Sequence, residues 1–364
     1  MLTLSLVTFA LACLPLLITT LNFATMRVVR DRSYPPIQVP VSVLIPMRNE
    51  ERNARACLEA ASASVGLADL SISVLDDNST DRTGEIAQSI PGIRVLSGKP
   101  LEAGWLGKNF AAHQLSESST GEYLVFIDAD VRLHPQAINS AITLMDSLGW
   151  SYISPYPRQI AKSLIEKLMQ PLLQWSFMSS LPLRLAERFH HESMVVANGQ
   201  FLIIKRDAYV AAGGHAAIRA SVLDDLELAR TLTRHGFYGG VADGSEVANC
   251  RMYTNRAELF EGYRKSLWTA FGGALGASGV AVFLAITGVL PLILCATSQP
   301  FFLAAYLAIV VSRILAGIKS RSSIRYSPVH ALSIVLFIYL LATSFWQHAN
   351  GQLTWRGRKI TTHG

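Results

Sequence analysis

The sequence has 364 residues, of which 50% are hydrophobic and only 16% are charged, a share well below that of soluble domains, so part of the chain is expected to lie in lipid. The net charge of +6 at pH 7 fits basic residues facing anionic lipid head groups, because the sequence has no basic helix, zinc-ligand spacing or aromatic–basic interleaving to indicate nucleic-acid binding. The four cysteines are far apart and form no Cys-x-x-Cys motif, which argues against a zinc site or a disulfide framework.

The first apolar segment, residues 1–26, carries no charged side chain and is long enough to cross a bilayer. A secretory signal peptide would begin with basic residues, whereas here Arg27, Arg30 and Arg32 follow the segment. The positive-inside rule therefore predicts a transmembrane anchor with its N-terminus outside and the next domain in the cytoplasm. Residues 27–40 are expected to be a linker, rich in proline from Ser33 to Pro40.

From Val41 onward, short apolar runs alternate with segments of helical pattern. This alternation predicts an α/β fold with a mostly parallel sheet flanked by helices. The predicted strands are residues 41–45, 72–75, 93–96 and 123–127, and the predicted helices are residues 49–63, 81–89, 108–118 and 135–148.

The strand at residues 123–127 is followed by Asp128-Ala-Asp130. Its continuous apolar run is typical of a strand buried on both faces. Two carboxylates after such a strand place hard oxygen ligands at the carboxyl edge of the sheet, where open α/β sheets bind ligands. We therefore predict that Asp128 and Asp130 hold a divalent metal ion on a nucleotide diphosphate. The structural alternative is that they only close a turn.

Two other predicted strands also end in polar residues. Because the carboxyl ends of parallel strands share one edge of the sheet, these residues are expected to converge with Asp128 and Asp130. Lys108 lies after a strand and before a helix on the same edge, so a role in the site and a solvated lysine are both open interpretations. The converging residues are Pro46, Arg48, Asn49 and Glu50 after the first strand, and Asp76 and Asp77 after the second.

Residues 161–185 have the apolar spacing of one helix face, with a kink expected at Pro171. A membrane-interface helix and a helix covering the sheet are both open interpretations. Strands are predicted at Met194–Ala197 and Gln200–Ile204, and a helix from about Leu223 to His235. Its opening pair, Asp224-Asp225, would complement the helix N-terminus even without a further role.

Residues 269–348 have a lipid-like composition with three apolar runs: Ala274–Ala296, Phe301–Val311 and Val329–Phe345. The basic loop Lys319–Arg325 between the last two runs is expected in the cytoplasm. One N-terminal and three C-terminal spans would place the tail, residues 349–364, outside, although its basic residues favour the inside. Either one run is re-entrant or the tail departs from the rule.

Together, these motifs resemble those of family 2 glycosyltransferases, which are inverting enzymes with a GT-A fold that take sugar from a nucleotide sugar. The resemblance covers about Val41–Tyr263, with a GT-A domain expected over residues 41–268. It implies a multi-pass enzyme of the cell membrane with its catalytic domain in the cytoplasm. Gly104–Asn109 and Trp355–Arg358 resemble the bacterial membrane-bound subgroup that glycosylates carotenoid acids or accompanies hopanoid synthesis. The family motifs are Pro46–Glu50, Asp76-Asp77, Asp128-Ala-Asp130 and Asp224-Asp225.

The resemblance implies a role for each motif. Asp130, with help from Asp128, would hold Mg²⁺ or Mn²⁺, and Asp225 would be the catalytic base with Asp224 beside it. The donor side would include Pro46, Arg48 and Glu50 at the nucleobase and ribose, Asp77 at the nucleoside, Lys108 at the diphosphate, and Asn49 and Asp76 from the same motifs. Asn198, Gly199 and Gln200 would border the acceptor.

Many relatives that extend polymers or modify sphingolipids carry Gln/Arg-x-x-Arg-Trp near the membrane. The nearest match here is Arg264-Lys-Ser-Leu-Trp268, whose different spacing argues against a processive polysaccharide synthase. The expected reaction is transfer of one sugar, from a UDP-sugar by family likeness, to a lipophilic acceptor such as a carotenoid acid or another isoprenoid lipid. Alternatives are a polyprenyl-phosphate sugar synthase and, in another class, a non-catalytic membrane scaffold.

Overall fold

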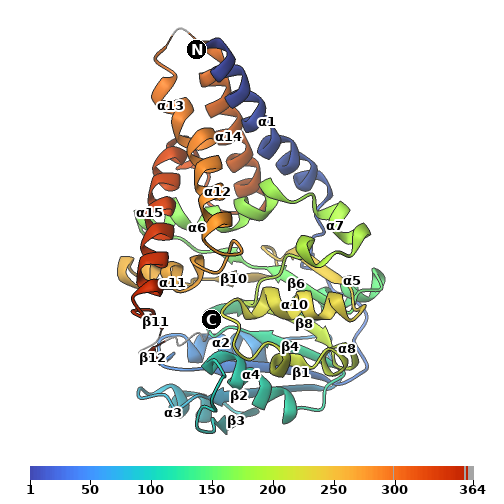
Figure 1. Ribbon diagram of the computed structural model, residues 1–364. Coiled ribbons are helices and arrows are strands. Elements are labelled where there is room, and N and C mark those ends of the chain that lie inside the picture. Colours follow the sequence, from blue (N-terminus) through green and yellow to red (C-terminus); the bar gives the residue numbers. More distant parts are fainter. Residues whose placement is uncertain (298, 356–357, 360–364) are drawn as a thin grey trace. The chain divides into compact units, whose positions relative to one another are not determined.

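The computed structural model describes residues 1–297, 299–355, 358 and 359, so part of the predicted basic tail (356, 357 and 360–364) lies outside the described residues. The chain forms two compact units (Figure 1). The α/β unit comprises Arg27–Arg158 and Ala186–Arg251. The helical unit comprises Met1–Met26, Gln159–Leu185 and the described residues from Met252 onward.

A seven-stranded sheet in the order β3-β2-β1-β4-β8-β6-β9 forms the centre of the α/β unit. The four strands from β3 to β4 are parallel, β8 is antiparallel to both of its neighbours, and β6 and β9 are parallel. The predicted mostly parallel sheet flanked by helices is therefore confirmed. The strands are β1 (Val41–Met47), β2 (Leu70–Asp76), β3 (Ile93–Ser97), β4 (Tyr123–Ile127), β6 (Tyr152–Tyr156), β8 (Phe201–Lys205) and β9 (Gly239–Asp243).

Short strands lie outside this sheet. β5 (Val131–Leu133) directly follows Asp130 and pairs antiparallel with β10 (Ala248–Cys250). β7 (Arg158–Gln159) has two residues, and β11 (Thr354–Trp355) pairs with β12 (Arg358–Lys359) as a hairpin. The pairing of β5 with β10 fixes the chain directly after the Asp128-Ala-Asp130 turn.

Helices pack on the sheet through their apolar faces. Leu115 of α4, and Leu228 and Leu232 of α10, belong to one buried cluster with Leu44 of β1 and Leu124 of β4. The polar first turn of α10 is thereby held at the sheet. The helices of this unit are α2 (Ala54–Ser62), α3 (Thr83–Gln88), α4 (Gly107–Glu117), α5 (Ala137–Ser147), α8 (Arg206–Ala211), α9 (Gly214–Ala217) and α10 (Asp224–Arg234), while α7 (Leu183–Phe189) begins in the helical unit.

Three local predictions differ from the structure. The helix predicted from residue 49 begins at Ala54, because Asn49 has a φ of 52° and starts a turn. The strand predicted at Met194–Ala197 is wrong: Glu192–Met194 is a 3₁₀ turn, and both edges of β8 are already paired with β4 and β6. The helix over 161–185 ends at Ser180, because Pro182 disfavours a helical conformation at Leu181, and Pro171 stays inside α6 (Leu164–Ser180).

The helical unit contains four helices long and apolar enough to cross a membrane, one near the N-terminus and three near the C-terminus, as the sequence predicts. Arg313 does not end the third of them; it is buried inside α14 and donates to Leu168 O and Ser333 Oγ, at 2.9 and 2.8 Å. The helices of this unit are α1 (Leu2–Thr25), α6, α11 (Arg256–Leu267), α12 (Ala274–Leu284) with a π-helical turn (Ala285–Val289) and α13 (Leu290–Leu294), α14 (Pro300–Lys319) and α15 (His330–Ala349).

The directions of these helices differ from simple alternation. α1 and α14 run parallel, because Phe9 packs on Phe301 near their starts and Lys319 Nζ donates to Phe23 O near their ends. α12 and α13 run the opposite way (Figure 1). α15 is antiparallel to α12. Phe271, before α12, packs on Phe337 in the middle of α15, and Gly288 in the later π-helical turn lies against His330 at the start of α15. α14 and α15 therefore run in the same direction.

The chain between α14 and α15 must turn back to allow this arrangement. Ser322 N–H donates to Gly317 O, and Tyr306 OH donates to Pro328 O, at 2.7 Å, so the connection returns along α14. α15 then starts beside the middle of α14, where His330 Nδ1 lies 3.3 Å from Arg313 Nη1. α1, α14 and α15 therefore all end toward the same side of the helical unit. This arrangement corresponds to the re-entrant alternative, which stays a prediction.

Candidate active site

The carboxyl ends of β1 and β4 meet the first turn of α10 at a small pocket. As predicted, groups far apart in the sequence come together there. The polar and charged side chains that line the pocket are Lys108, Asp128, His215, Asp224 and Asp225, with Pro46 and Gly199 between them.

Lys108 joins the two acidic pairs. Its Nζ lies 2.9 Å from Asp128 Oδ1 and 3.2 Å from Asp224 Oδ2. Partial burial lowers the pKa of Lys108, but the attraction of Asp128, Asp224 and Asp225 outweighs it and raises that pKa well above its usual value. Lys108 is therefore a permanent cation between the strand-end carboxylates and those of α10.

Asp225 is held by two backbone donors. Gly199 N–H donates to Oδ2 at 2.7 Å and Leu226 N–H to Oδ1 at 2.8 Å. An added Cβ at position 199 would lie 3.1 Å from Asp225 Cβ and 3.4 Å from Lys108 Nζ, so a larger residue would displace Asp225 by a few tenths of an ångström. Burial and the neighbouring Asp224 raise the pKa of Asp225 to about 6, despite the opposing effect of Lys108 and the two N–H groups.

Asp130 lies deeper in the same edge. Its Oδ1 is buried and has no hydrogen-bond partner among the described residues. Burial, followed by repulsion from Asp128 and Glu50, raises its pKa to about 7, and a hydrogen bond with the Cys250 thiol only partly offsets this. A buried carboxylate without a donor is stabilised either by taking up a proton or by a nearby cation.

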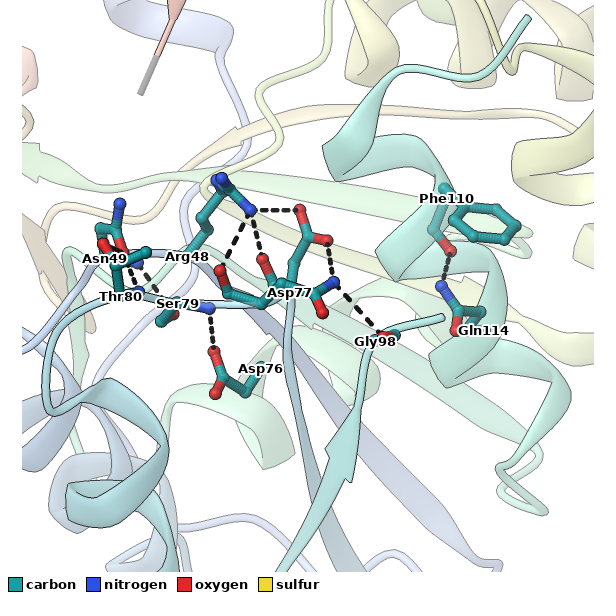
Figure 2. Close-up of polar contacts among 10 residues, drawn as sticks. Arg48, Asn49, Asp76, Asp77, Ser79, Thr80, Gly98, Phe110 and Gln114 are labelled. Atoms are coloured by element: carbon teal, nitrogen blue, oxygen red, sulfur yellow. Dashed lines mark hydrogen bonds and ion pairs between the residues drawn. The ribbon is translucent and has the colours of Figure 1, made fainter. Parts of the chain in front are cut away.

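The strand-end loops after β1 and β2 are joined by polar contacts (Figure 2). Arg48 Nη1 donates to the carbonyls of Asp77 and Asn78 and lies 3.9 Å from Asp77 Oδ2. Asn49 Oδ1 accepts from Thr80 N–H at 2.9 Å. The guanidinium of Arg48 and the carboxylate of Asp77 thus face one another above the sheet edge.

Asp76 and Glu50 also make hydrogen bonds in the loops after β1 and β2. Asp76 Oδ1 accepts from Ser79 N–H at 3.1 Å, and an added Cβ at Gly84 would lie 2.6 Å from its Oδ2, so this side chain points into the turn (Figure 2). Glu50 N–H donates to Thr83 Oγ1, and Glu50 Oε2 accepts from Asn53 Nδ2 at 2.8 Å. These contacts fix the backbone of the predicted donor-binding motif.

Asn198 and Gln200 shape the turn that carries Gly199. Asn198 Oδ1 accepts from Gln200 N–H at 2.9 Å, and Asn198 N–H donates to Ser154 Oγ at 2.8 Å. Gln200 is buried, and its carbonyl accepts from Asp128 N–H at 3.1 Å. The turn before β8 therefore links Asp128 and Asp225 through the backbone.

Two residues to which the sequence assigned no role in the site help to position the carboxylates. Asn109 is buried and its Nδ2 donates to the carbonyls of Ile218, Arg219 and Ser221, which holds the loop before Asp224 against α4. The sequence signal for this role was its position: Asn109 follows Lys108 in the first turn of a helix, although asparagine has a low helix propensity.

Arg132 supports the Asp128-Ala-Asp130 turn from behind. It donates to the carbonyls of Ala129 and Val131, both at 2.8 Å, and to Asn53 Oδ1 at 3.0 Å. Asn53 in turn donates to Glu50, so one chain of contacts connects the loops after β1 and β4. A basic residue close after paired acids was the only sequence signal for this role.

His215 closes the back of the pocket. Its Nδ1 lies 2.8 Å from Tyr209 OH, and its ring packs edge-on against Phe126. Burial lowers the pKa of His215 to about 4, so it is neutral at physiological pH. It therefore adds no charge beside Lys108.

Several known glycosyltransferases are similar to this chain in sequence or in fold. The chain is 24% identical over 344 residues to a 4,4'-diaponeurosporenoate glycosyltransferase of Staphylococcus haemolyticus, covering 88% of each chain. It is 24% identical over 341 residues to the enzyme of that name from Staphylococcus aureus strain USA300, again covering 88% of each. The fold is similar to that of a mannosyltransferase from Pyrobaculum calidifontis solved with GDP-Man and Mn²⁺, with a TM-score of 0.55 and 15% identity over 94% of this chain and 99% of that one.

The model of the family described as "Glycosyl transferase family 2" matches residues 42–226, a range that contains β1, β2 and β4 and the start of α10. All the carboxylates gathered at the sheet edge fall inside it. The chain therefore belongs to glycosyl transferase family 2, and the protein is a glycosyltransferase.

Proposed function

We propose that this protein transfers one sugar from a nucleotide-sugar donor to a lipophilic acceptor, with inversion at the anomeric carbon and with help from a divalent metal ion. The observation that carries the proposal is the pocket in which Lys108 lies between Asp128 and Asp224, with Asp225 beside them. One acidic pair is suited to a metal–diphosphate, and the other to deprotonating an acceptor. We place the reaction at the cytoplasmic face of the cell membrane, where the positive-inside rule puts Arg27, Arg30 and Arg32.

The residues of the site fit Mg²⁺ or Mn²⁺. Asp130 offers a buried oxygen without a partner among the described residues, and Asp128 a second carboxylate from the same turn. No cluster of three or more metal-ligating side chains occurs in the described part of the chain. Two carboxylates suit an ion that takes one or two ligands from the protein and the others from substrate phosphates and water. When bound, such an ion stabilises negative charge on the diphosphate oxygens.

The donor would lie along the carboxyl ends of β1, β2 and β4. Lys108, already cationic, would attract the diphosphate, and its release from Asp128 would leave that carboxylate available to the metal. Arg48 and Asp77 would meet the nucleoside, with Pro46 at the pocket wall. Asn49, Glu50 and Asp76 would act mainly by fixing the two loops, because the hydrogen bonds described above join them to loop atoms.

Asp225 is placed to act as the base. An acceptor oxygen attacks the anomeric carbon from the face opposite the leaving group, and the bond from that carbon to the diphosphate oxygen breaks. The nucleoside diphosphate leaves with the electron pair, and the proton of an acceptor hydroxyl passes to Asp225. A pKa of about 6 keeps Asp225 mostly ionised at neutral pH and still basic. Asp224 would assist by holding Lys108, and Asn198, Gly199 and Gln200 by forming the acceptor-side turn.

The acceptor class follows from the apolar helices and from the relatives. The staphylococcal enzymes are named for 4,4'-diaponeurosporenoate, a carotenoid acid, and four helices of this chain are apolar enough to place it in a bilayer. An acceptor that is already a carboxylate needs no deprotonation, so Asp225 would then orient it. We propose a carotenoid acid or another isoprenoid lipid as the acceptor and a UDP-sugar as the donor.

The test is to incubate membranes containing the protein with a panel of labelled nucleotide sugars and to identify the lipid products by mass spectrometry. An ester or ether glycoside would support the proposed acceptor, and a glycosyl phosphate would favour a polyprenyl-phosphate acceptor instead. Asp130→Asn should abolish transfer and metal-dependent donor binding, whereas Asp225→Asn should keep donor binding and lose turnover. Asp69→Asn, at an exposed carboxylate in the same unit, is the control. Normal turnover by Asp130→Asn would refute the metal assignment.

A further inference from the structure

A second pocket, with a volume of about 420 Å³, lies within the helical unit between α11 and the carboxyl end of α15. Its size is in the range of about 300–1,000 Å³ that small-molecule sites occupy. The polar and aromatic side chains that line it are Arg256, Phe260, Glu261, Arg264, Gln347 and Gln352. Because Arg256, Phe260 and Arg264 are spaced by four residues, they lie on one face of α11.

Two guanidinium groups flank the same aromatic ring. The Cζ atoms of Arg256 and Arg264 lie 5.0 and 5.5 Å from the centroid of Phe260. Arg264 also donates to Thr343 Oγ1 at 3.0 Å, whereas Arg256 makes no hydrogen bond to any described residue. Neither arginine forms an ion pair within the described ranges of the chain. The pocket therefore presents two cations and one carboxylate, Glu261, and has a net attraction for an anion.

α15 carries an exposed apolar stripe that leads toward the pocket and ends in aromatic side chains. Leu332, Tyr339 and Trp346 recur every seven residues, so they lie along one face of the helix, and each is at least 50% exposed. Trp268 of the segment after α11 stacks on His348, with ring centroids 3.7 Å apart. Aromatic side chains concentrate at the level of lipid head groups. The pocket therefore lies at the end of an exposed apolar stripe on a helix long enough to enter a bilayer.

We propose that this pocket binds the head group of an anionic membrane phospholipid. Arg256 and Arg264 hold its phosphate, since guanidinium groups match phosphate oxygens in geometry and charge. Gln347, Gln352 and Glu261 meet the hydroxyl groups of a glycerol-type head group. The acyl chains follow the apolar stripe of α15. All residues of the site belong to the helical unit, and its binding test requires neither donor nor acceptor.

The test uses the full-length protein in neutral detergent, stripped of lipid, with binding of dioctanoyl phosphatidylglycerol followed by native mass spectrometry. Arg256→Gln is the decisive variant. Because Arg256 makes no hydrogen bond to a described residue, its replacement should leave the fold intact. Loss of one guanidinium–phosphate contact is expected to weaken binding about tenfold or more. Arg264→Gln should weaken it similarly, and Arg264→Lys less, because charge remains without the planar fork. Lys265→Gln removes an equal charge from the same helix outside the pocket and should bind as the wild type does.

Ligands that differ in charge or in acyl chains test which part of the lipid the pocket recognises. Dioctanoyl phosphatidylcholine, which carries no net charge, is expected to bind at least about tenfold more weakly than the anionic lipid. Equal binding of the two lipids, or wild-type affinity in a correctly folded Arg256→Gln protein, would overturn it. Glycerol 3-phosphate, which lacks acyl chains, should not compete at matched concentrations. If it competed as well as the lipid did, the pocket would be a site for soluble phosphates and the lipid would be the wrong occupant.

Discussion

Replacing Lys108 by methionine tests how the candidate active site balances its charges. The substitution keeps most of the length of the side chain and removes the cation. In the native site, Nζ lies 2.9 Å from Asp128 Oδ1 and 3.2 Å from Asp224 Oδ2. In the variant, both acidic pairs lose the positive charge that joins them, so their mutual repulsion opposes folding.

The magnitude follows from the exposure of the three side chains. Removing one partner of a fully buried ion pair costs about 3–5 kcal/mol, and an exposed pair contributes about 0–1 kcal/mol. The side chains of Lys108, Asp128 and Asp224 are 39%, 29% and 16% exposed, which places them between these limits. We expect a loss of about 2 kcal/mol, equivalent to a fall of about 4–8 °C in the thermal midpoint of a domain of this size.

The assay is thermal unfolding of the full-length protein in detergent, with and without Mn²⁺, beside a transfer assay. Because a bound divalent cation would replace the lost charge, Mn²⁺ should raise the midpoint of Lys108→Met by more than that of the wild type. Transfer should stay low, since the donor diphosphate loses its lysine. Lys99→Met, at an exposed lysine of the same unit, should behave as the wild type does. Equal shifts with Mn²⁺ in both proteins would refute the reasoning that Lys108 is the counter-charge of these carboxylates.

Four further predictions follow from the geometry. Gly199→Ala, whose added Cβ would lie 3.1 Å from Asp225 Cβ, should lower kcat by about tenfold to a hundredfold with little change in donor affinity. Gly279→Ala, whose Cβ would meet nothing within 4 Å, is its control. With a hydroxyl acceptor, kcat/KM should fall as the pH drops through about 6, because protonated Asp225 cannot accept a proton; a flat profile there would remove it as the base. Asn109→Ala leaves three carbonyls without their donor and should cost about 1–3 kcal/mol in thermal unfolding, with faster hydrogen exchange in the loop before α10. A cysteine introduced at Asn350 should react with a membrane-impermeant thiol reagent only after the cytoplasmic side is opened, as the shared direction of α14 and α15 requires.

The four parallel strands and the acidic edge could be predicted because each rests on a local pattern. The apolar run Tyr123–Ile127 is typical of a strand buried on both faces, and it forms the central strand β4. Parallel neighbours then bring Asp77 and Asp128 to one edge without further information. The roles of these residues stay predictions that the variants above test.

Other strands could not be predicted because tertiary contacts override their local pattern. β6 contains Pro155, which lacks a backbone donor, and β9 begins with Gly239 and Gly240, which seldom form strands. An added Cβ at Gly239 would lie 2.1 Å from Tyr152 O, so the glycine is there because β6 and β9 approach closely. The requirement appears only when both strands are in place.

The positioning residues and the helix directions are hidden for a related reason. The bonds of Asn109 reach the chain 109 to 112 residues later, and no periodicity encodes such a pairing. Likewise, an apolar run predicts a helix but not the direction in which it lies. The re-entrant connection between α14 and α15 depends on Tyr306 and Gly317, which inside an apolar helix look like ordinary packing residues.

The two acidic pairs of the site have the same composition but different surroundings, and this difference supports the separate roles that we propose for them. Asp130 has a buried oxygen without a donor among the described residues, so its ionised form requires a cation from outside the chain. Asp225 receives two backbone N–H groups, so its ionised form is already supported and a proton can come and go near neutral pH. Lys108 forms its ion pairs with Asp128 and Asp224, one from each pair. The other two carboxylates, Asp130 and Asp225, are the ones that we propose meet the metal and the acceptor.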